Sequence, residues 1–226
     1  MFSKGRSIVT GPLPIGWAMR LLQVNVGRVQ TRTNARGREE TTGIGKHPVT
    51  GPVGVGPAGL DGDESAYRSR DIGDTALHGF AVESYAALES RFGQALPRPA
   101  FGENLLFAGY GDADARIGDV LAIGTALVMV NQPVPRCGWP GVLTGVKALG
   151  PQAMKAGTPG WYMQVVRAGI VAAGDAVDLV QRGDAAWTVA RLNALLLNKH
   201  PDPAVVAAAL AHPILADRFK KELRAS

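Results

Sequence analysis

The sequence ALVMVNQPVPRCGWP, residues 126–140, decides how this 226-residue chain is organised. Its first five residues are apolar and include two valines, a composition that predicts a buried strand. Three prolines among the next ten fix φ and remove backbone donors, so we expect the strand to give way to a rigid loop. Cys137, the only cysteine of the chain, then lies just past a strand end, where folds commonly present reactive groups.

Cys137 has two interpretations. The guanidinium of Arg136, its neighbour in sequence, favours the thiolate, which is the form that attacks electrophiles and binds soft metals. A lone cysteine is also often a small buried hydrophobe that only fills space. The proline-rich loop argues for the reactive interpretation, because a packing cysteine usually lies within a regular element. These residues alone leave both interpretations open.

Length and composition are those of a globular protein rich in turns and short strands, since 46% of the residues are hydrophobic and 29 are glycine. The chain is long enough for one sizeable domain, or for a core domain with a small appendage. A single cysteine allows no intrachain disulfide and no cysteine cluster, which favours a reducing, cytoplasmic location. No apolar run approaches the ~20 residues of a membrane span, so we expect no membrane association.

The net charge of +5 is carried by the beginning of the chain. Residues 1–38 hold seven basic residues and no acidic one, so residues 39–226 sum to −2. A nucleic-acid-binding domain usually has a basic stripe interleaved with aromatic residues, and the body of this sequence has none. We therefore predict no nucleic-acid partner.

Three regions are expected along the chain. Residues 1–18 are broken by glycines and prolines, lack the apolar core of a signal peptide and are predicted to be a disordered extension. Residues 19–183 are predicted to form a β-barrel, because short strands with glycine corners recur and few crossover helices separate them. Residues 184–226 are rich in alanine and leucine with helical spacing, which predicts a small three-helix domain. The fold class is thus mainly β with α.

Individual elements follow from periodicity and breaking residues. Leu22, Val24 and Val26 alternate with polar residues, as in a half-buried strand. A helix is predicted over 82–92, and residues 31–42 are predicted to be a polar, basic loop. The expected starts of the three C-terminal helices share capping or proline signals. These signals lie at Thr188, at Asp202 with Pro203, and at Pro213.

Several familiar motifs are excluded. Gly54, Gly56 and Gly59 match a dinucleotide-binding fingerprint, but a proline and an Asp-Gly-Asp turn follow where that fingerprint needs a helix. The four histidines show no metal-binding spacing. The acidic segment 61–64 lacks the later ligands of a calcium loop and is expected to be a turn.

A set of polar residues in expected loops remains as a candidate site. Lys46 and Arg136 can hold phosphate oxygens, and Asn104 can hydrogen-bond an amide edge. Cys137 can bind a metal or carry sulfur. Three further residues complete the set: Glu103, Arg70 and His78.

The set belongs to a series of motifs in a specific order. The motifs are TGIxKxPVxGPVxVGPxGLxGDE at 42–64, FGENL at 101–105, IGDV at 117–120, NQPVPRC at 131–137 and the three-helix tail. From about residue 19 to the end, this order resembles the MOSC domain proteins, and in particular their YiiM-like branch. MOSC denotes the C-terminal domain of molybdenum cofactor sulfurases. The resemblance implies a MOSC β-barrel followed by a small three-helix domain.

The resemblance also implies chemistry on the molybdenum cofactor, with the signature cysteine of the family falling on Cys137. In this hypothesis the Cys137 thiolate ligates molybdenum of the pterin cofactor. Lys46 and Arg136 neutralise the pterin phosphate, and Asn104 orients cofactor or substrate. Glu103 is assigned to the same cofactor-binding set.

Members of the family split between two activities. Stand-alone relatives resemble reductases that remove oxygen from N-hydroxylated bases, and sulfurase-type domains carry sulfur to the metal. This chain has no aminotransferase-like, pyridoxal-phosphate-linked domain to make a persulfide, so we favour a reductase acting on a small molecule with an external electron-donor protein. The alternative is a sulfur carrier that receives a persulfide on Cys137 from a desulfurase.

The chain departs from the family pattern in two places. Where the family usually shows HGGxDRAL, this chain has RDIGDTAL at 70–77. In the cysteine loop, the common arginine after Gln-Pro is Val134 here, and Arg136 stands nearer the thiol. These departures motivate a third hypothesis, a non-catalytic binding module.

Overall fold

The computed structural model describes residues 19–66, 73–135 and 137–226. The prediction of a disordered extension over residues 1–18 therefore lies outside the described residues, as do Arg70 and Arg136. Within the described ranges, no helix is both long enough and apolar enough to cross a membrane.

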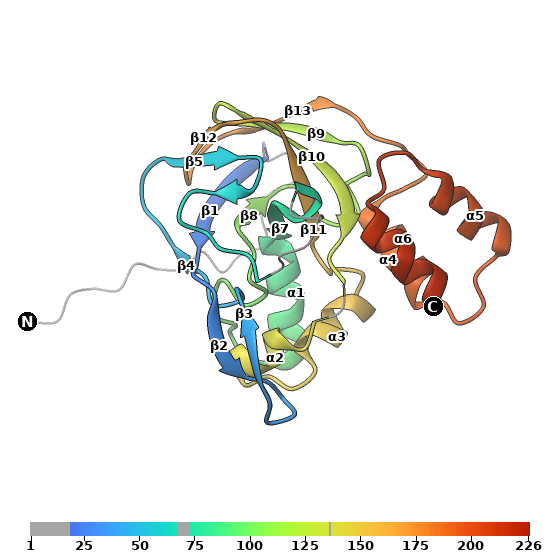
Figure 1. Ribbon diagram of the computed structural model, residues 1–226, viewed down its shortest axis with the longest axis horizontal. Coiled ribbons are helices and arrows are strands. Elements are labelled where there is room, and N and C mark those ends of the chain that lie inside the picture. The colour runs from blue at the N-terminus through green and yellow to red at the C-terminus, as the bar shows by residue number, and fades with distance from the viewer. Residues whose placement is uncertain (1–18, 67–72, 136) are drawn as a thin grey trace, which may run out of the picture.

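Eight strands make up the main sheet (Figure 1): β1 (Arg20–Val26), β4 (His47–Pro48), β7 (Leu77–Ala81), β8 (Leu105–Ala108), β9 (Val120–Ile123), β10 (Ala126–Pro133), β11 (Trp161–Arg167) and β13 (Val177–Gln181). Their order across the sheet is β13-β9-β10-β11-β7-β8-β1-β4. Neighbours are antiparallel apart from the parallel pair β7 and β8, which the helix α1 (Val82–Phe92) connects. A parallel pair needs such a crossover.

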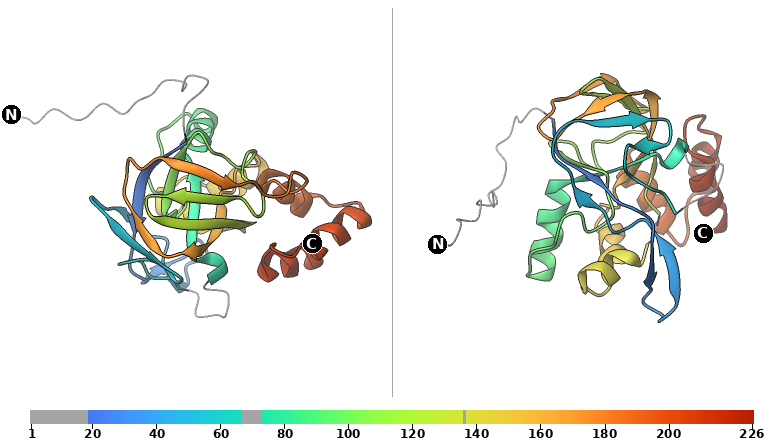
Figure 2. Two further views of the ribbon diagram at one scale, coloured as in Figure 1. Left: turned by 90° about the horizontal axis from the view of Figure 1, so that it is seen from above. Right: turned by 60° about the vertical axis from the view of Figure 1, so that its left-hand side comes forward.

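The main sheet curls back on itself, as the view from above in Figure 2 makes clear. Strand β1, the last but one in this order, meets the segment that leads into β13 at the other edge. There the Leu21 N–H donates to the Asp175 carbonyl at 3.0 Å and the Gly174 N–H donates to the Leu21 carbonyl at 2.7 Å. This half-barrel with added helices confirms the predicted fold class.

Two smaller sheets extend the barrel. One pairs β12 (Gly169–Val171) with β5 (Val53–Gly56), which in turn pairs with β6 (Gly59–Leu60). The other is the hairpin of β2 (Gln30–Thr33) and β3 (Glu39–Thr42), which projects beyond the barrel in Figure 1. The prediction of a loop over 31–42 was therefore wrong. These strands are mostly exposed and polar, so their apolar periodicity gives no signal.

The cysteine loop is shorter than the sequence predicts. Strand β10 continues as far as Pro133, and the helix α2 (Trp139–Thr144) begins soon after Cys137. Pro133 stands opposite Trp161 at the end of the strand, where a missing backbone donor costs little, and Pro140 occupies the first turn of α2. A further short helix, α3 (Leu149–Lys155), follows.

Three helices close the chain: α4 (Val189–Leu197), α5 (Pro203–Ala211) and α6 (Asp217–Ala225). The predicted caps of the first two are confirmed, because Thr188 and Asp202 accept hydrogen bonds from the first turns of α4 and α5. The prediction that α6 opens at Pro213 was wrong. His212 Nδ1 faces the N–H groups of Ile214 and Leu215 at 3.3 Å each, which places the proline in a turn before the helix.

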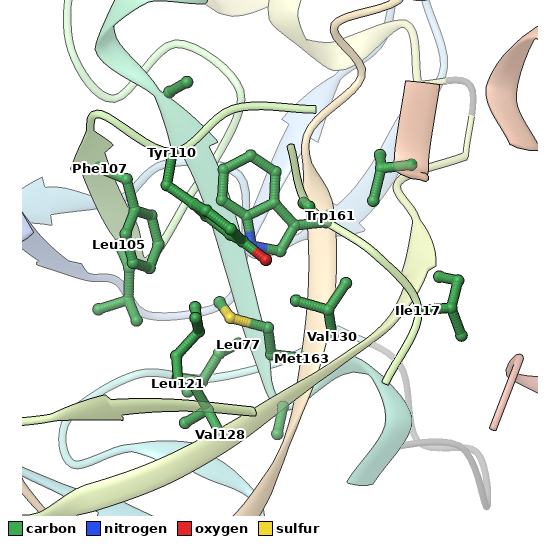
Figure 3. Packing of buried hydrophobic residues seen from close by; sticks show 14 of the residues in the cluster. Leu77, Leu105, Phe107, Tyr110, Ile117, Leu121, Val128, Val130, Trp161 and Met163 are labelled. Atoms are coloured by element: carbon green, nitrogen blue, oxygen red, sulfur yellow. The ribbon is translucent and has the colours of Figure 1, made fainter. Parts of the chain in front are cut away.

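One hydrophobic cluster fills the barrel and continues into the C-terminal helices. Trp161 lies at its centre in Figure 3, with the rings of Tyr110 and Phe107 5.4 and 5.5 Å away. Leu192 and Phe219 from the C-terminal helices belong to the same cluster. The helices are therefore packed on the barrel, which brings α6 close to β10. A short 3₁₀ helix, η1 (Gly73–Thr75), precedes β7.

Candidate functional site

A row of polar residues crosses the sheet near the end of β10. Gln132 on β10 stands opposite Tyr162 on β11, which stands opposite His78 on β7. The His78 N–H donates to Asn104 Oδ1 at 3.0 Å, and the Asn25 N–H donates to the Asn104 carbonyl at 2.7 Å. We call these five residues the polar row. It joins strands that are far apart in sequence.

The polar row lies on the outer face of the curled sheet. Leu77, Trp161 and Val24, which flank members of the row in sequence, belong to the cluster inside the barrel. Since successive side chains of a strand point to opposite faces, the row faces away from that core. The inner face is thus hydrocarbon, and hydrogen-bonding groups gather on the outer face.

Two members of the row carry buried polar atoms without a hydrogen-bond partner among the described residues. They are Nε2 of His78 and both side-chain atoms of the Asn25 amide. Buried polar atoms are rarely left unpaired, because each costs free energy comparable to a lost hydrogen bond. The row therefore has unused hydrogen-bonding capacity.

The unpaired nitrogen of His78 is an acceptor. Burial, followed by the nearby charge of Lys46, lowers the pKa of His78 to about 3, so the imidazole is neutral at physiological pH. The ring also hydrogen-bonds the Gly102 carbonyl, which must accept from the protonated ring nitrogen. Because Nε2 has no partner, the proton lies on Nδ1 and Nε2 offers a lone pair.

Lys46 and Asn104 both hydrogen-bond the carboxylate of Asp63, a residue that the sequence predicted to lie in a turn. Asp63 Oδ1 accepts from Lys46 Nζ and from the Gly27 N–H at 2.8 Å, and Asp63 Oδ2 accepts from Asn104 Nδ2 at 2.8 Å. The side chains of Lys46 and Asp63 are only 9% and 11% exposed. The positive charge of Lys46 is therefore already compensated within the protein.

Asn104 has a structural role. Its Nδ2 also faces the Asn25 carbonyl at 3.2 Å, so both donor positions of the amide are occupied and the oxygen accepts from β7. Asn104 fixes the positions of β1 and β7 relative to each other and holds Asp63 against them.

Glu103 is fully enclosed, with one oxygen accepting from the Tyr85 hydroxyl at 2.7 Å and the other from the Phe101 N–H at 3.1 Å. Burial raises the pKa of Glu103 to about 7, against the lowering effect of these hydrogen bonds. The charge of Glu103 acts on Lys46, where it favours the ammonium form. The carboxylate thus influences the site through charge, without reaching its surface.

The raised pKa predicts a pH-dependent effect on stability. Between about pH 4.5 and pH 7 the folded protein keeps a proton on Glu103 that the unfolded chain has released, so this group makes the free energy of unfolding fall as pH rises through that window. Glutamine mimics the protonated acid. We expect Glu103→Gln to gain up to about 3 kcal/mol relative to the wild type across the window.

Denaturant unfolding of both proteins at several pH values measures this gain. His78 and Asp112 titrate abnormally too, so the difference between variant and wild type is the informative quantity. If the free energies of unfolding of the two proteins change with pH in parallel, Glu103 does not keep its proton in the folded state and the raised pKa is contradicted.

Cys137 lies in the connection 134–138 between β10 and α2, and its side chain is partly exposed. The connection leaves β10 beside the row: the Val134 N–H donates to the Gly160 carbonyl at 3.0 Å, and a methyl group added to Gly160 would lie 2.8 Å from His78 Nε2. The cysteine loop therefore begins at a residue that is hydrogen-bonded to Gly160, and Gly160 packs against the unpaired nitrogen.

The thiol of Cys137 is less acidic than the sequence suggests. Burial raises its pKa, and the Trp139 N–H that hydrogen-bonds the sulfur and the positive charge of Arg218 offset this effect only in part. The expected thiolate-favouring partner, Arg136, lies outside the described residues. The described cation that acts on the thiol comes from α6.

The C-terminal helices thus contribute to the site. The Ala216 N–H donates to the Asn131 carbonyl at 3.2 Å, which ties the start of α6 to β10. A hollow of about 340 Å³ lies between the cysteine loop and these helices, with Pro135 and Arg218 in its wall. The three-helix region therefore forms part of the surroundings of Cys137.

We expect Arg218→Gln to make the Cys137 thiol less acidic, because a cation that favours the thiolate is removed. Alkylation by iodoacetamide at neutral pH should slow about two- to fourfold. Cys137 is the only cysteine, so the reaction reports on one thiol. Arg224→Gln, an exposed position on the same helix, is the matched control. Equal rates for all three proteins would contradict the electrostatic role of Arg218.

The structure thus joins the predicted residues Lys46 and Asn104 in one buried cluster at a central anion, Asp63, while the predicted residue Glu103 acts on Lys46 through its charge. Arg218 is the second residue that the sequence did not indicate. The GDE motif offered a signal for Asp63, whereas nothing local indicates that Arg218 reaches a loop about eighty positions earlier in the chain.

A metal at Cys137 would need donors from a bound organic group. Among the residues that the structure describes, no group of three or more histidine, cysteine, aspartate or glutamate side chains is placed to hold a metal ion. Cys137 supplies one soft sulfur, and the polar row supplies unpaired groups suited to a heterocycle. The donor set therefore fits a metal carried by its own organic ligand.

Comparison with known proteins identifies the family. The model of the MOSC domain matches residues 50–178. The protein YflK of Bacillus subtilis is 28% identical over 201 residues, which are 88% of this chain and 90% of YflK. The protein YiiM of Escherichia coli is 28% identical over 165 residues, covering 71% of this chain and 72% of YiiM. The chain belongs to the MOSC domain family.

Within that family it is a YiiM-like protein. The crystal structure of YiiM from Geobacillus stearothermophilus superposes with a TM-score of 0.76 at 28% identity, covering 92% of this chain and 98% of that one. A protein of Gibberella moniliformis named as a reductase is 27% identical over 223 residues, but this chain spans only 38% of its length.

Proposed function

We propose that this protein binds the molybdenum cofactor and reduces N-hydroxylated bases or related compounds, with the Cys137 thiolate as protein ligand to the metal. The observation that carries the proposal is the polar row, with its buried and unpaired atoms on His78 and Asn25; His78 Nε2 lies against Gly160, whose carbonyl accepts from Val134 at the start of the cysteine loop. Membership of the MOSC family and the relative named as a reductase support it.

The reaction removes one oxygen atom. An N–OH group takes up two electrons and two protons, the N–O bond breaks, and the products are N–H and water. Molybdenum held at Cys137 would supply the two electrons for this reduction. We propose an external protein as the electron donor, because the single cysteine of this sequence cannot hold an iron–sulfur cluster.

The chain's own residues bind and orient. His78 Nε2 accepts a hydrogen bond from an N–H or O–H of a bound heterocycle, and the amide of Asn25 can both donate and accept. Cys137 would hold the metal as a thiolate, and the bond to the metal would offset the burial that raises the pKa of the thiol. Arg218 stabilises the resulting negative charge on the sulfur.

The test uses protein made in a host that synthesises the cofactor. We expect bound molybdenum by elemental analysis, and reduction of an N-hydroxylated purine with a chemically reduced dye as electron donor. Protein that carries no molybdenum from such a host would contradict the proposal. Protein that carries molybdenum but does not reduce N-hydroxylated compounds would contradict only the proposed substrate class.

The partly exposed thiol also suits a second function, sulfur carriage. In that case incubation with a cysteine desulfurase and free cysteine leaves a persulfide on Cys137, which adds the mass of one sulfur to the protein. Persulfide formation without molybdenum binding would favour the carrier over the reductase.

A further inference from the structure

A second hollow adjoins the cysteine loop on the side of the β2–β3 hairpin. Its volume is about 210 Å³, and we call it the hairpin hollow. The hairpin contributes Asn34, Arg36, Arg38 and the acidic residue Glu40, and the start of α2 contributes Trp139. Figure 1 shows the hairpin and α2 lying next to each other below the barrel.

In the hairpin turn, the side chain of Asn34 holds the backbone of both arginines. Asn34 Oδ1 accepts from the Arg36 N–H at 2.8 Å and from the Arg38 N–H at 3.1 Å. Asn34 Nδ2 donates to Glu40 at 2.6 Å, and Arg38 lies 3.8 Å from the same carboxylate. Within the part of the chain that the structure describes, the Arg36 guanidinium makes no hydrogen bond or ion pair.

Trp139 connects the hollow to the reactive sulfur. Trp139 is one of the residues that line the hollow, and its backbone N–H hydrogen-bonds the Cys137 thiol. An indole next to a guanidinium is suited to a planar heterocycle that carries an anionic group, because the guanidinium binds phosphate oxygens and the ring stacks. The wall of the hollow therefore matches a phosphate ester of a heterocyclic ligand.

The buried cluster is a poor alternative for binding that phosphate. Lys46 was expected to hold it, yet its charge is already matched by Asp63 and its side chain is almost fully buried. A phosphate would have to compete with a carboxylate that also holds Gly27 and Asn104. Arg36 is exposed and uncommitted, so it can bind an anion without breaking an existing pair.

We propose that the hairpin hollow binds the phosphate-bearing end of the cofactor, with Arg36 and Arg38 on the phosphate and Trp139 against the heterocycle. This inference rests on the proposed function, because it takes Cys137 as the ligand to the metal at the other end. It differs from the expectation that Lys46 and Arg136 hold the phosphate.

The test measures phosphate binding apart from activity. Calorimetric titration with inorganic pyrophosphate is carried out on the wild type, Arg36→Gln, the double variant Arg36→Gln/Arg38→Gln and the control Arg224→Gln. We expect at least about tenfold weaker binding in the double variant and unchanged binding in the control, since the double variant loses its charge-assisted hydrogen bonds to the phosphate oxygens. Cys137→Ala should bind pyrophosphate like the wild type.

Molybdenum content of the same proteins, made in a cofactor-synthesising host, links the hollow to the cofactor. A loss of molybdenum from the double variant supports the proposal. Equal pyrophosphate affinity in the double variant and the wild type overturns it, as does weaker pyrophosphate binding with full molybdenum content. A wild type that lacks molybdenum but binds pyrophosphate through Arg36 contradicts the proposed function and shows the hollow to be a site for free phosphate.

Discussion

Cys137→Ala is expected to lose at least about 100-fold in affinity for molybdenum, and its reductase activity should fall at least as far. Removing a hydrogen-bond partner of a metal ligand already costs about 10- to 100-fold, and here the ligand itself is removed. Elemental analysis after gel filtration and the rate of N-hydroxylated purine reduction measure the two effects.

The fold should tolerate this change, because the thiol is partly exposed and lies in a connection between elements. We expect a change in stability of about 1 kcal/mol or less. Cys137→Ser preserves the size of the side chain but replaces soft sulfur by hard oxygen, so it should fail in the same way. Full molybdenum content in either variant would remove Cys137 from the metal site.

Asp63→Ala is expected to lower the free energy of unfolding by about 3–5 kcal/mol, because it leaves the ammonium of Lys46 buried without its partner. The N–H of Gly27 and the amide of Asn104 lose an acceptor as well. Burial already lowers the pKa of Lys46 in spite of Asp63, which shows that desolvation outweighs the attraction between the two charges. Denaturant unfolding at constant pH measures the loss.

A double variant separates the missing contact from the stranded charge. Lys46→Met removes the ammonium and keeps much of the side-chain volume. Asp63→Ala/Lys46→Met should therefore be more stable than Asp63→Ala alone, by about 1–3 kcal/mol. Strict additivity of the two single changes would contradict the view that an unpaired buried charge dominates the cost.

The sequence predicts those elements whose signals are local. Alternation at Val24 and Val26 identifies β1, and the side chains of Thr188 and Asp202 mark helix starts that the structure confirms. Prediction fails where a tertiary contact overrides the local signal. Pro213 indicates a helix start, but the His212 ring and the bond from Ala216 to Asn131 hold the segment before α6 in a turn.

In the candidate site, too, local sequence signals predict some residues, and others depend on tertiary contacts. Residue types and motif order named Lys46, Asn104 and Cys137 as candidates, but not the residues that contact them. Asp63 does lie in a turn, as its sequence suggests. Its place at the centre of a buried cluster arises only when the residues next to β1 and β8 fold around it. Arg218 acts on Cys137 only because the C-terminal helices pack on the barrel. The sizes of the hollows likewise follow from tertiary packing alone.

The central claim is that the sulfur of Cys137 is bonded to the metal of the cofactor. X-ray absorption at the molybdenum edge tests it most directly, by comparing the wild-type holoprotein with cofactor released from it under reducing conditions. The account predicts one sulfur neighbour more around molybdenum in the holoprotein. An identical number of sulfur neighbours in the two samples would contradict it.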